Sequence, residues 1–132
     1  MRPVDVVTQL WGRVDARDWP GMERLVAADV VVEWPVSGER IVGRANFVAV
    51  QSEYPEGWSI RVLRIVAQGE QEPGRPAEVV SEVEVPHTEL GIFRAASFWT
   101  VHDGRITAAT EYWTNLYGEQ PPVWRQELTE AM

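Results

Sequence analysis

The hydrophobic period of this sequence changes partway along the chain. Up to about residue 50, apolar side chains recur at the three- and four-residue spacing of amphipathic helices, as Val4, Val7, Trp11 and Val14 do. From Trp58 onward the period is two, which is typical of strands with one buried face. Helices followed by consecutive strands predict an α+β domain in which the helices pack on one face of a mainly antiparallel sheet.

Capping and turn residues define the expected elements. Three helices are expected to start at Pro3, Asp18 and Gly43, because these positions suit a first turn or an N-cap. Five strands are expected over Val30–Trp34, Trp58–Ala67, Ala77–Pro86, Ile92–His102 and Arg105–Tyr117. The Asp103-Gly104 pair is the strongest hairpin signal, since a two-residue turn needs positive φ at both positions.

Length and composition limit the class of protein. The 132 residues predict one domain spanning 1–132, with a body at about 4–117 and a C-terminal tail at 118–132. The net charge of -8 argues against a nucleic-acid partner, and no long apolar run predicts a membrane segment. The acids within the first apolar stretch indicate a mature helix rather than a signal peptide, so a cytoplasmic location is expected.

Metal and cofactor motifs are absent from the sequence. There is no cysteine, and the two histidines, His87 and His102, are expected beside hairpins at opposite ends of the strands, roughly 35 Å apart. Neither HExxH nor GxSxG nor a phosphate-binding glycine loop occurs. We therefore expect no metal and no cofactor.

Two segments resemble a known family. These are DWPGMERLVAADVVVEWPVSGERIVGRANF at 18–47 and FWTVHDGRITAATEYW at 98–113, and they resemble the nuclear transport factor 2 superfamily, within it the SnoaL-like group that includes polyketide cyclases. The resemblance in element order covers about residues 4–117. It implies a cone-shaped fold whose curved sheet wraps around the long first helix and leaves a pocket open at one end. This scaffold hosts isomerases, hydrolases, cyclases, dehydratases and non-catalytic binders, so it indicates a fold more than an activity.

The resemblance also assigns positions to the groups that ketosteroid isomerases of the superfamily use. Their catalytic aspartate precedes a proline, and Trp34 stands at that position here, before Pro35. Their two oxyanion-hole residues correspond to Leu10 and Ala96. The known isomerase mechanism is therefore not expected, and Trp34 is predicted to form part of the pocket wall.

Glu111 is the leading candidate for chemistry. The alternation Ala109, Glu111, Trp113 places its carboxylate on the face of a tryptophan that lines the pocket in relatives. Desolvation among indoles would raise its pKa and suit it to general acid or base catalysis. The alternative is that Glu111 is solvated at the pocket mouth or paired with Arg94.

A second resemblance concerns limonene epoxide hydrolases, which hold a water between two aspartates joined by an arginine. It implies that Glu111 takes the place of one aspartate and Glu84 or Glu82 that of the other, with Arg94 as a substitute for the arginine. Simple alternation of the strand instead leaves Glu82 and Glu84 facing solvent.

The aromatic residues have two interpretations. They line a cavity for a small apolar organic molecule, or they fill the cone solidly. The set comprises Trp34, Tyr54, Trp58, Phe98 and Trp113. The resemblance further implies a homodimer through the outer sheet face, with Trp99 and Tyr112 as anchors, and the tail either packs back through Trp124 or crosses to a partner.

Three functional classes remain open at this point. The first is a cofactor-independent isomerase, cyclase or dehydratase that uses Glu111. The second is an epoxide hydrolase-like enzyme with a carboxylate pair. The third is a non-catalytic binding or dimerisation module.

Overall fold

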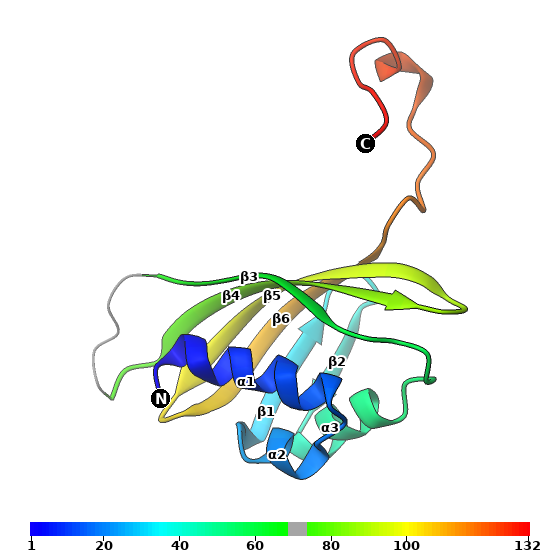
Figure 1. Cartoon of the computed structure of the whole chain (residues 1–132). Coiled ribbons are helices and arrows are strands. Elements are labelled where there is room, and N and C mark those ends of the chain that lie inside the picture. The colour runs from blue at the N-terminus through cyan, green and yellow to red at the C-terminus, as the bar shows by residue number, and fades with distance from the viewer. Residues whose placement is uncertain (69–73) are drawn as a thin grey trace.

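A curved six-stranded sheet carries the α-helices on one of its faces (Figure 1) in the computed structural model, which describes residues 1–68 and 74–132. The helices are α1 (Pro3–Asp15), α2 (Trp19–Glu23) and α3 (Arg44–Ser52). The strands are β1 (Val26–Trp34), β2 (Glu39–Val42), β3 (Arg61–Ala67), β4 (Ala77–His87), β5 (Gly91–His102) and β6 (Arg105–Asn115). Their order is β2-β1-β6-β5-β4-β3, antiparallel except for β1 and β6. The expected α+β architecture is confirmed.

Three strands differ from the prediction by more than two residues, and one of them is β1, which begins at Val26 rather than Val30. β2 was not expected, because its sequence ERIV is too short and too polar to show a period; it pairs with β1 around a turn closed by the bond from Gly38 N–H to the Trp34 carbonyl oxygen. β3 begins at Arg61 rather than Trp58. Trp58 instead forms an isolated bridge with His87, which anchors the segment between α3 and β3.

The core lies between α1 and the concave face of the sheet. The inward side of α1 consists of Val6, Val7, Leu10, Trp11 and Val14, all buried. The rings of Trp11 and Trp99 meet edge to face with centroids 5.7 Å apart. Both indole N–H groups donate to the buried Oγ of Ser81, at 3.0 Å from Trp11 and 2.8 Å from Trp99. One hydroxyl therefore joins the helix to β4 and β5.

A bulge in β6 decides which side chains face inward. Thr100 pairs with Ala108 and Val101 with Ile106, so Thr107 is an extra residue on β6. Beyond the bulge, Trp99 lies opposite Ala109 in the core, and it is fully buried. Phe98 lies on the outer face and is 41% exposed. The predicted positions of Phe98 in the pocket and of Trp99 on the outer face are therefore wrong.

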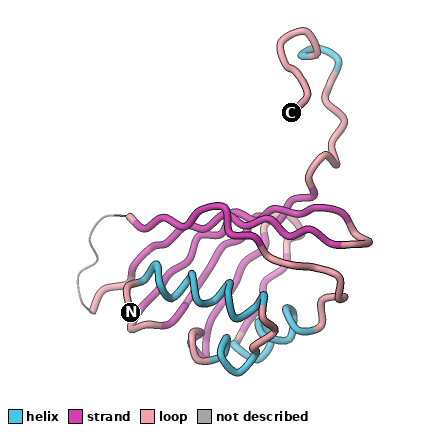
Figure 2. The backbone as a smooth tube through the Cα atoms, in the orientation of Figure 1, coloured by secondary structure: helices cyan, strands magenta, loops and turns pink. Residues whose placement is uncertain are grey.

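The C-terminal segment after β6 leaves the body on the side of the sheet away from the helices (Figure 1). Most of it is loop (Figure 2), with a short 3-10 helix at Val123–Arg125. Trp124 is 74% exposed, so it does not pack back on its own chain. No helix in the described part of the chain is long and apolar enough to cross a membrane.

The Ser81 hydroxyl provides a test of this core. Replacing Ser81 with Ala leaves two buried indole N–H groups without an acceptor, which we expect to lower the free energy of unfolding by about 2–4 kcal/mol. Urea denaturation measures the change. Ser59→Ala, at an exposed site, is the control and should stay within about 0.5 kcal/mol. A Ser81 variant that behaves like this control would contradict the role of the shared hydroxyl.

Candidate functional site

A cavity of about 230 Å³ lies between the helices and the concave face of the sheet. Four tryptophans form much of its wall: Trp11, Trp34, Trp58 and Trp113. The other lining residues are Val50, Gln51, Tyr54, Ile60, Val85 and Phe93. The wall is therefore almost entirely apolar and aromatic, which is the usual composition of a small-molecule site.

The lining agrees in part with the residues chosen from the sequence. Trp34, Tyr54, Trp58 and Trp113 lie at the cavity, as expected; their contact with a ligand stays a prediction. Trp11 was assigned to the helix core from its spacing, and that spacing carries no signal to distinguish a core residue from a cavity residue. Of the other additional lining residues, Val50 and Gln51 lie in the last turn of α3, Ile60 lies in an irregular segment, and Val85 and Phe93 lie near strand ends. Periodicity gives little guidance at such positions.

Glu111 points inward from the middle of β6 and is 1% exposed. Its Oε2 accepts a hydrogen bond of 2.6 Å from the hydroxyl of Ser97, its cross-strand neighbour on β5. Its Oε1 accepts a bond of 3.1 Å from the indole Nε1 of Trp34, at the end of β1. Both carboxyl oxygens therefore have donors, although the carboxyl group has no basic partner among the described residues.

Burial raises the pKa of the Glu111 carboxyl above its usual 4.5, because desolvation penalises the charged form. The hydrogen bonds from Ser97 and Trp34 oppose this rise and lower the pKa by a smaller amount. The indole N–H of Trp113 acts in the same direction as these two bonds, from outside hydrogen-bonding geometry. Glu111 is thus a protonatable group at the edge of an apolar cavity.

Trp34 separates this carboxyl from the cavity. Trp34 is among the lining residues, whereas Glu111 is not. The indole ring faces the cavity while its N–H group binds the carboxyl. A large aromatic residue at the end of a buried strand therefore has two functions here: it forms part of the wall and it caps the acid.

The other predicted polar residues lie on the opposite face of the sheet. Glu84 pairs with Arg94 across β4 and β5, and its carboxylate forms ion pairs of 2.6 Å with Arg61 and 3.2 Å with Arg94. Ala96 lies opposite Tyr112, also on the outer face. The predictions that Glu84 and Arg94 lie beside Glu111 are wrong. The bulge at Thr107 places Arg94 on the face opposite to Glu111, and the alternation of β4 turns Glu82 and Glu84 outward, as the alternative interpretation expected.

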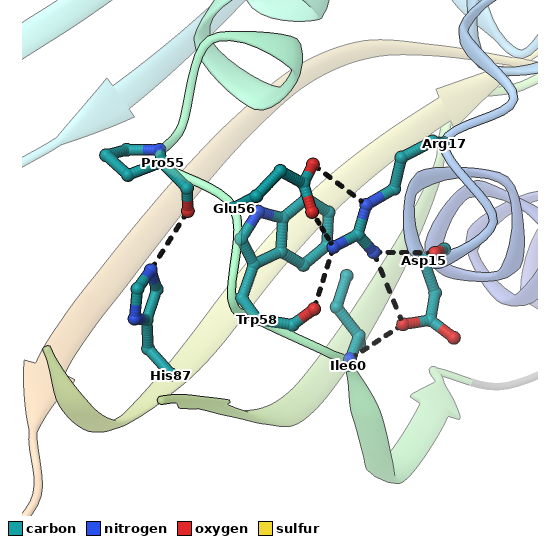
Figure 3. A network of polar contacts seen from close by, with 7 residues as sticks. All are labelled: Asp15, Arg17, Pro55, Glu56, Trp58, Ile60 and His87. Carbon is teal, nitrogen blue, oxygen red and sulfur yellow. Dashed lines mark hydrogen bonds and ion pairs between the residues drawn. The ribbon is translucent and has the colours of Figure 1, made fainter. Parts of the chain in front are cut away.

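A polar network fixes the segment that carries Trp58 at the cavity (Figure 3). The guanidinium of Arg17 lies 3.3 Å from the centroid of the Trp58 ring and donates 2.7 Å and 2.8 Å bonds to the Trp58 carbonyl and the Glu56 carboxylate. On the other side, His87 Nε2 lies 2.9 Å from the Pro55 carbonyl oxygen. His87 lies at the end of β4, beside the turn to β5 as expected, and its side chain is buried.

Two indole N–H groups of the wall lack partners. Nε1 of Trp58 and Nε1 of Trp113 are buried, and neither has a hydrogen-bond acceptor within the part of the chain that the structure describes. An unpaired buried donor costs about 1–3 kcal/mol.

Within residues 1–68 and 74–132, no three acidic or histidine side chains gather in a way that could hold a metal ion.

The curved sheet, with the helices and the cavity on one of its faces, defines an α+β domain of the nuclear transport factor 2-like class. The model of the SnoaL-like domain matches residues 7–109, so the chain belongs to the SnoaL-like family. No curated protein sequence matches the chain significantly.

Solved structures show the same fold. A provisionally named ketosteroid isomerase from Kribbella flavida is 28% identical, with a TM-score of 0.81; the match covers 97% of this chain, extending beyond β6 into the tail, and 87% of that chain. An LEH-like epoxide hydrolase from M. tuberculosis is 20% identical, with a TM-score of 0.65 and coverage of 84% and 81%. A provisionally named polyketide cyclase from Pseudomonas putida is 24% identical, with a TM-score of 0.65 and coverage of 88% and 93%. The last two likenesses show the fold alone.

The raised pKa of Glu111 predicts a pH-dependent stability. Between the usual pKa of 4.5 and the higher folded value, the folded protein holds a proton that the unfolded chain has lost, so stability falls as pH rises through this window. Glu111→Gln keeps a side chain that can bond both Ser97 and Trp34, and it removes this titration. Urea midpoints measured from pH 4.5 upward should therefore decline less steeply for the variant than for the wild type. Parallel pH profiles would show that Glu111 titrates normally.

Proposed function

We propose that this chain binds a small, mainly apolar organic molecule in the cavity between the helices and the sheet. The observation that carries the proposal is the aromatic wall, in which four indoles surround a space of about 230 Å³. A cavity filled by side chains would leave no such space, which argues against the alternative in which the aromatic residues pack the cone solidly. A ring-shaped apolar ligand against an aromatic wall buries a large apolar area, and the rigid rings lose little conformational entropy on binding.

The unpaired donors suggest the polar character of the molecule. Trp58 and Trp113 each offer an N–H group without an acceptor, and both side chains line the cavity. A ligand with a neutral acceptor oxygen, such as a carbonyl, would satisfy one of them once the indole ring turns its N–H, which is buried in this structure, toward the cavity. The lining contains no acidic side chain that could form an ion pair with a ligand.

The volume suggests the size of the molecule. An apolar cavity of about 150 Å³ holds one benzene ring, and pockets for drug-sized molecules begin at about 300 Å³. The cavity here falls between these values. We therefore expect a molecule of one or two rings, or one end of a longer molecule.

Calorimetric titration with a matched pair of two-ring molecules tests the binding proposal. α-Tetralone, which carries a carbonyl oxygen, should bind roughly tenfold more tightly than tetralin, its hydrocarbon counterpart, through one added hydrogen bond. Trp113→Phe or Trp58→Phe removes an indole donor and should reduce this ratio, whereas Trp124→Phe in the exposed tail should leave it unchanged. Equal affinities for the two molecules in the wild type would contradict a donor-lined site.

A second candidate function is cofactor-independent acid–base catalysis by Glu111, of the kind an isomerase, cyclase or dehydratase performs. The observation that favours it is a buried carboxyl with a raised pKa directly behind the cavity wall. A carboxyl with a raised pKa can take a proton from a carbon acid and return it.

Access of the substrate to the acid depends on Trp34. Its indole N–H occupies Oε1 of Glu111, so the ring has to move off the carboxyl before a bound molecule can exchange a proton there. The hydrogen bond from Ser97 to Oε2 would hold the carboxyl in place during that exchange.

The carboxylate-pair mechanism has no support at this site. It requires a second acid within one water of Glu111 and a cation between them. Glu82 and Glu84 instead form ion pairs on the outer face, with Arg64 at 3.1 Å and with Arg61 at 2.6 Å. Of the three classes open from the sequence, the binding module and the single-acid enzyme thus fit the geometry.

Exchange of protons between α-tetralone and the solvent tests the catalytic proposal. In D₂O, the wild type should accelerate deuterium incorporation next to the carbonyl of α-tetralone, followed by NMR, and Glu111→Gln should lower the rate about 100-fold or more. Trp34→Phe keeps an aromatic wall but removes a bond that lowers the pKa of Glu111, so the rate profile should shift to higher pH. An unchanged rate in Glu111→Gln would leave binding as the function.

A further inference from the structure

Two side chains of the cavity wall can both donate and accept hydrogen bonds, and they lie three positions apart in the chain. Gln51 is in the last turn of α3, and Tyr54 follows shortly after the end of this helix. Both side chains are half-buried, whereas Trp11 of the same wall is only 3% exposed. Gln51 and Tyr54, called here the polar pair, therefore lie nearer the opening of the cavity than Trp11 does.

The hydrogen-bonding groups of the polar pair are not used within the described part of the chain. Neither the amide of Gln51 nor the hydroxyl of Tyr54 has a hydrogen-bond partner there. Burial raises the pKa of the Tyr54 hydroxyl above its usual value, because desolvation disfavours the phenolate, so the hydroxyl keeps its proton at neutral pH. A glutamine amide offers N–H donors and a carbonyl acceptor, and a phenol offers a donor and an acceptor on one oxygen. Donors and acceptors are therefore both available to a molecule in the cavity.

Two neighbouring rings hold the ring of Tyr54 in place. Its centroid lies 6.1 Å from that of Trp58 and 5.6 Å from that of His87. His87 is itself fixed, because its Nε2 lies 2.9 Å from the Pro55 carbonyl oxygen (Figure 3) and its Nδ1 accepts bonds of 3.0 and 3.2 Å from two backbone N–H groups of the turn to β5. The Tyr54 hydroxyl is thus held by a preorganised scaffold, which lowers the entropic cost of binding to it.

The charges around the polar pair favour a neutral ligand group. The C-terminal end of a helix carries partial negative charge, and Gln51 lies in the last turn of α3, close to the exposed Glu53. Among the described residues, the cavity lining contains no lysine or arginine. The guanidinium of Arg17 packs on the ring of Trp58 and already pairs with Glu56. An anionic group at this end of the cavity would therefore meet negative charge without a basic partner.

We infer that the polar pair is a specificity site that binds a hydroxyl group of the ligand, an alcohol or a phenol. One member donates to the hydroxyl oxygen, and the other accepts the hydroxyl proton. The inference rests on the proposed binding function and narrows its ligand class to hydroxylated molecules of one or two rings. A site built to hydrogen-bond a hydroxyl group discriminates against the analogue that lacks it, because its own polar groups are then left unpaired.

Calorimetric titration of the full chain with α-tetralone, its ring-hydroxylated isomers and their methyl ethers tests the specificity site. The best-binding hydroxy isomer should bind about tenfold more tightly than α-tetralone, since its hydroxyl adds a donated and an accepted hydrogen bond. Its methyl ether, which cannot donate, should lose most of this gain. Tyr54→Phe and Gln51→Met should each reduce the gain about threefold or more, while α-tetralone itself binds within about twofold of the wild type. A merely structural role would weaken both ligands together.

Matched controls come from the exposed C-terminal tail. Tyr117→Phe and Gln126→Met remove the same hydroxyl and amide groups away from the cavity and should leave the affinity ratio within about twofold. Circular dichroism confirms that each variant is folded. A wild type that binds α-tetralone but gains nothing from any hydroxy isomer would overturn this inference and leave the proposed function standing. A wild type that binds none of these probes would overturn both, and equal losses for α-tetralone and the hydroxy isomer in Tyr54→Phe and Gln51→Met would overturn the role of the polar pair.

Discussion

The ladder between β5 and β6 fixes the two faces of this molecule, and one extra residue sets its register. Because side chains alternate along a strand, shifting the pairing by one residue exchanges the inner and outer sets. With Thr107 bulged, Ser97 and Trp99 face the core beside Glu111 and Ala109. The core hydrogen bonds, the acid behind the cavity wall and the exposed position of Phe98 on the outer face all follow from this register.

The same bulge explains most of what sequence reasoning misplaced. In an unbroken ladder from the Asp103-Gly104 turn, Phe98 would lie opposite Ala109 and Arg94 opposite Trp113, which is the arrangement that simple alternation predicts. The periods, caps and turn residues were enough to predict the helices and the long strands. The inward position of Glu111 followed from the alternation of its strand together with the resemblance to relatives in which the neighbouring tryptophan lines the pocket. A bulge leaves no comparable mark here, because adjacent Phe98 and Trp99 are equally plausible core residues by type.

The pKa of Glu111 reflects a balance between the desolvation of its carboxyl group and the two hydrogen bonds that this group accepts. Moving a carboxyl into an apolar interior is unfavourable when it is charged, and the protein lowers that cost without supplying an arginine or lysine. Ser97 and Trp34 donate to the two oxygens, yet desolvation outweighs them and the pKa rises. A basic partner would have produced a structural ion pair; neutral donors leave a group that can still exchange a proton.

Trp34 shows how one side chain links the wall to the acid. Its position at the end of β1, before the turn at Pro35, lets the ring reach the cavity while its N–H points to β6. A smaller apolar residue there would enlarge the cavity and leave Oε1 without a donor. The volume of the cavity and the pKa of Glu111 would therefore change together. The strand-ending indole therefore belongs to the site and not only to the core, and the composition of the strand alone could not distinguish these two roles.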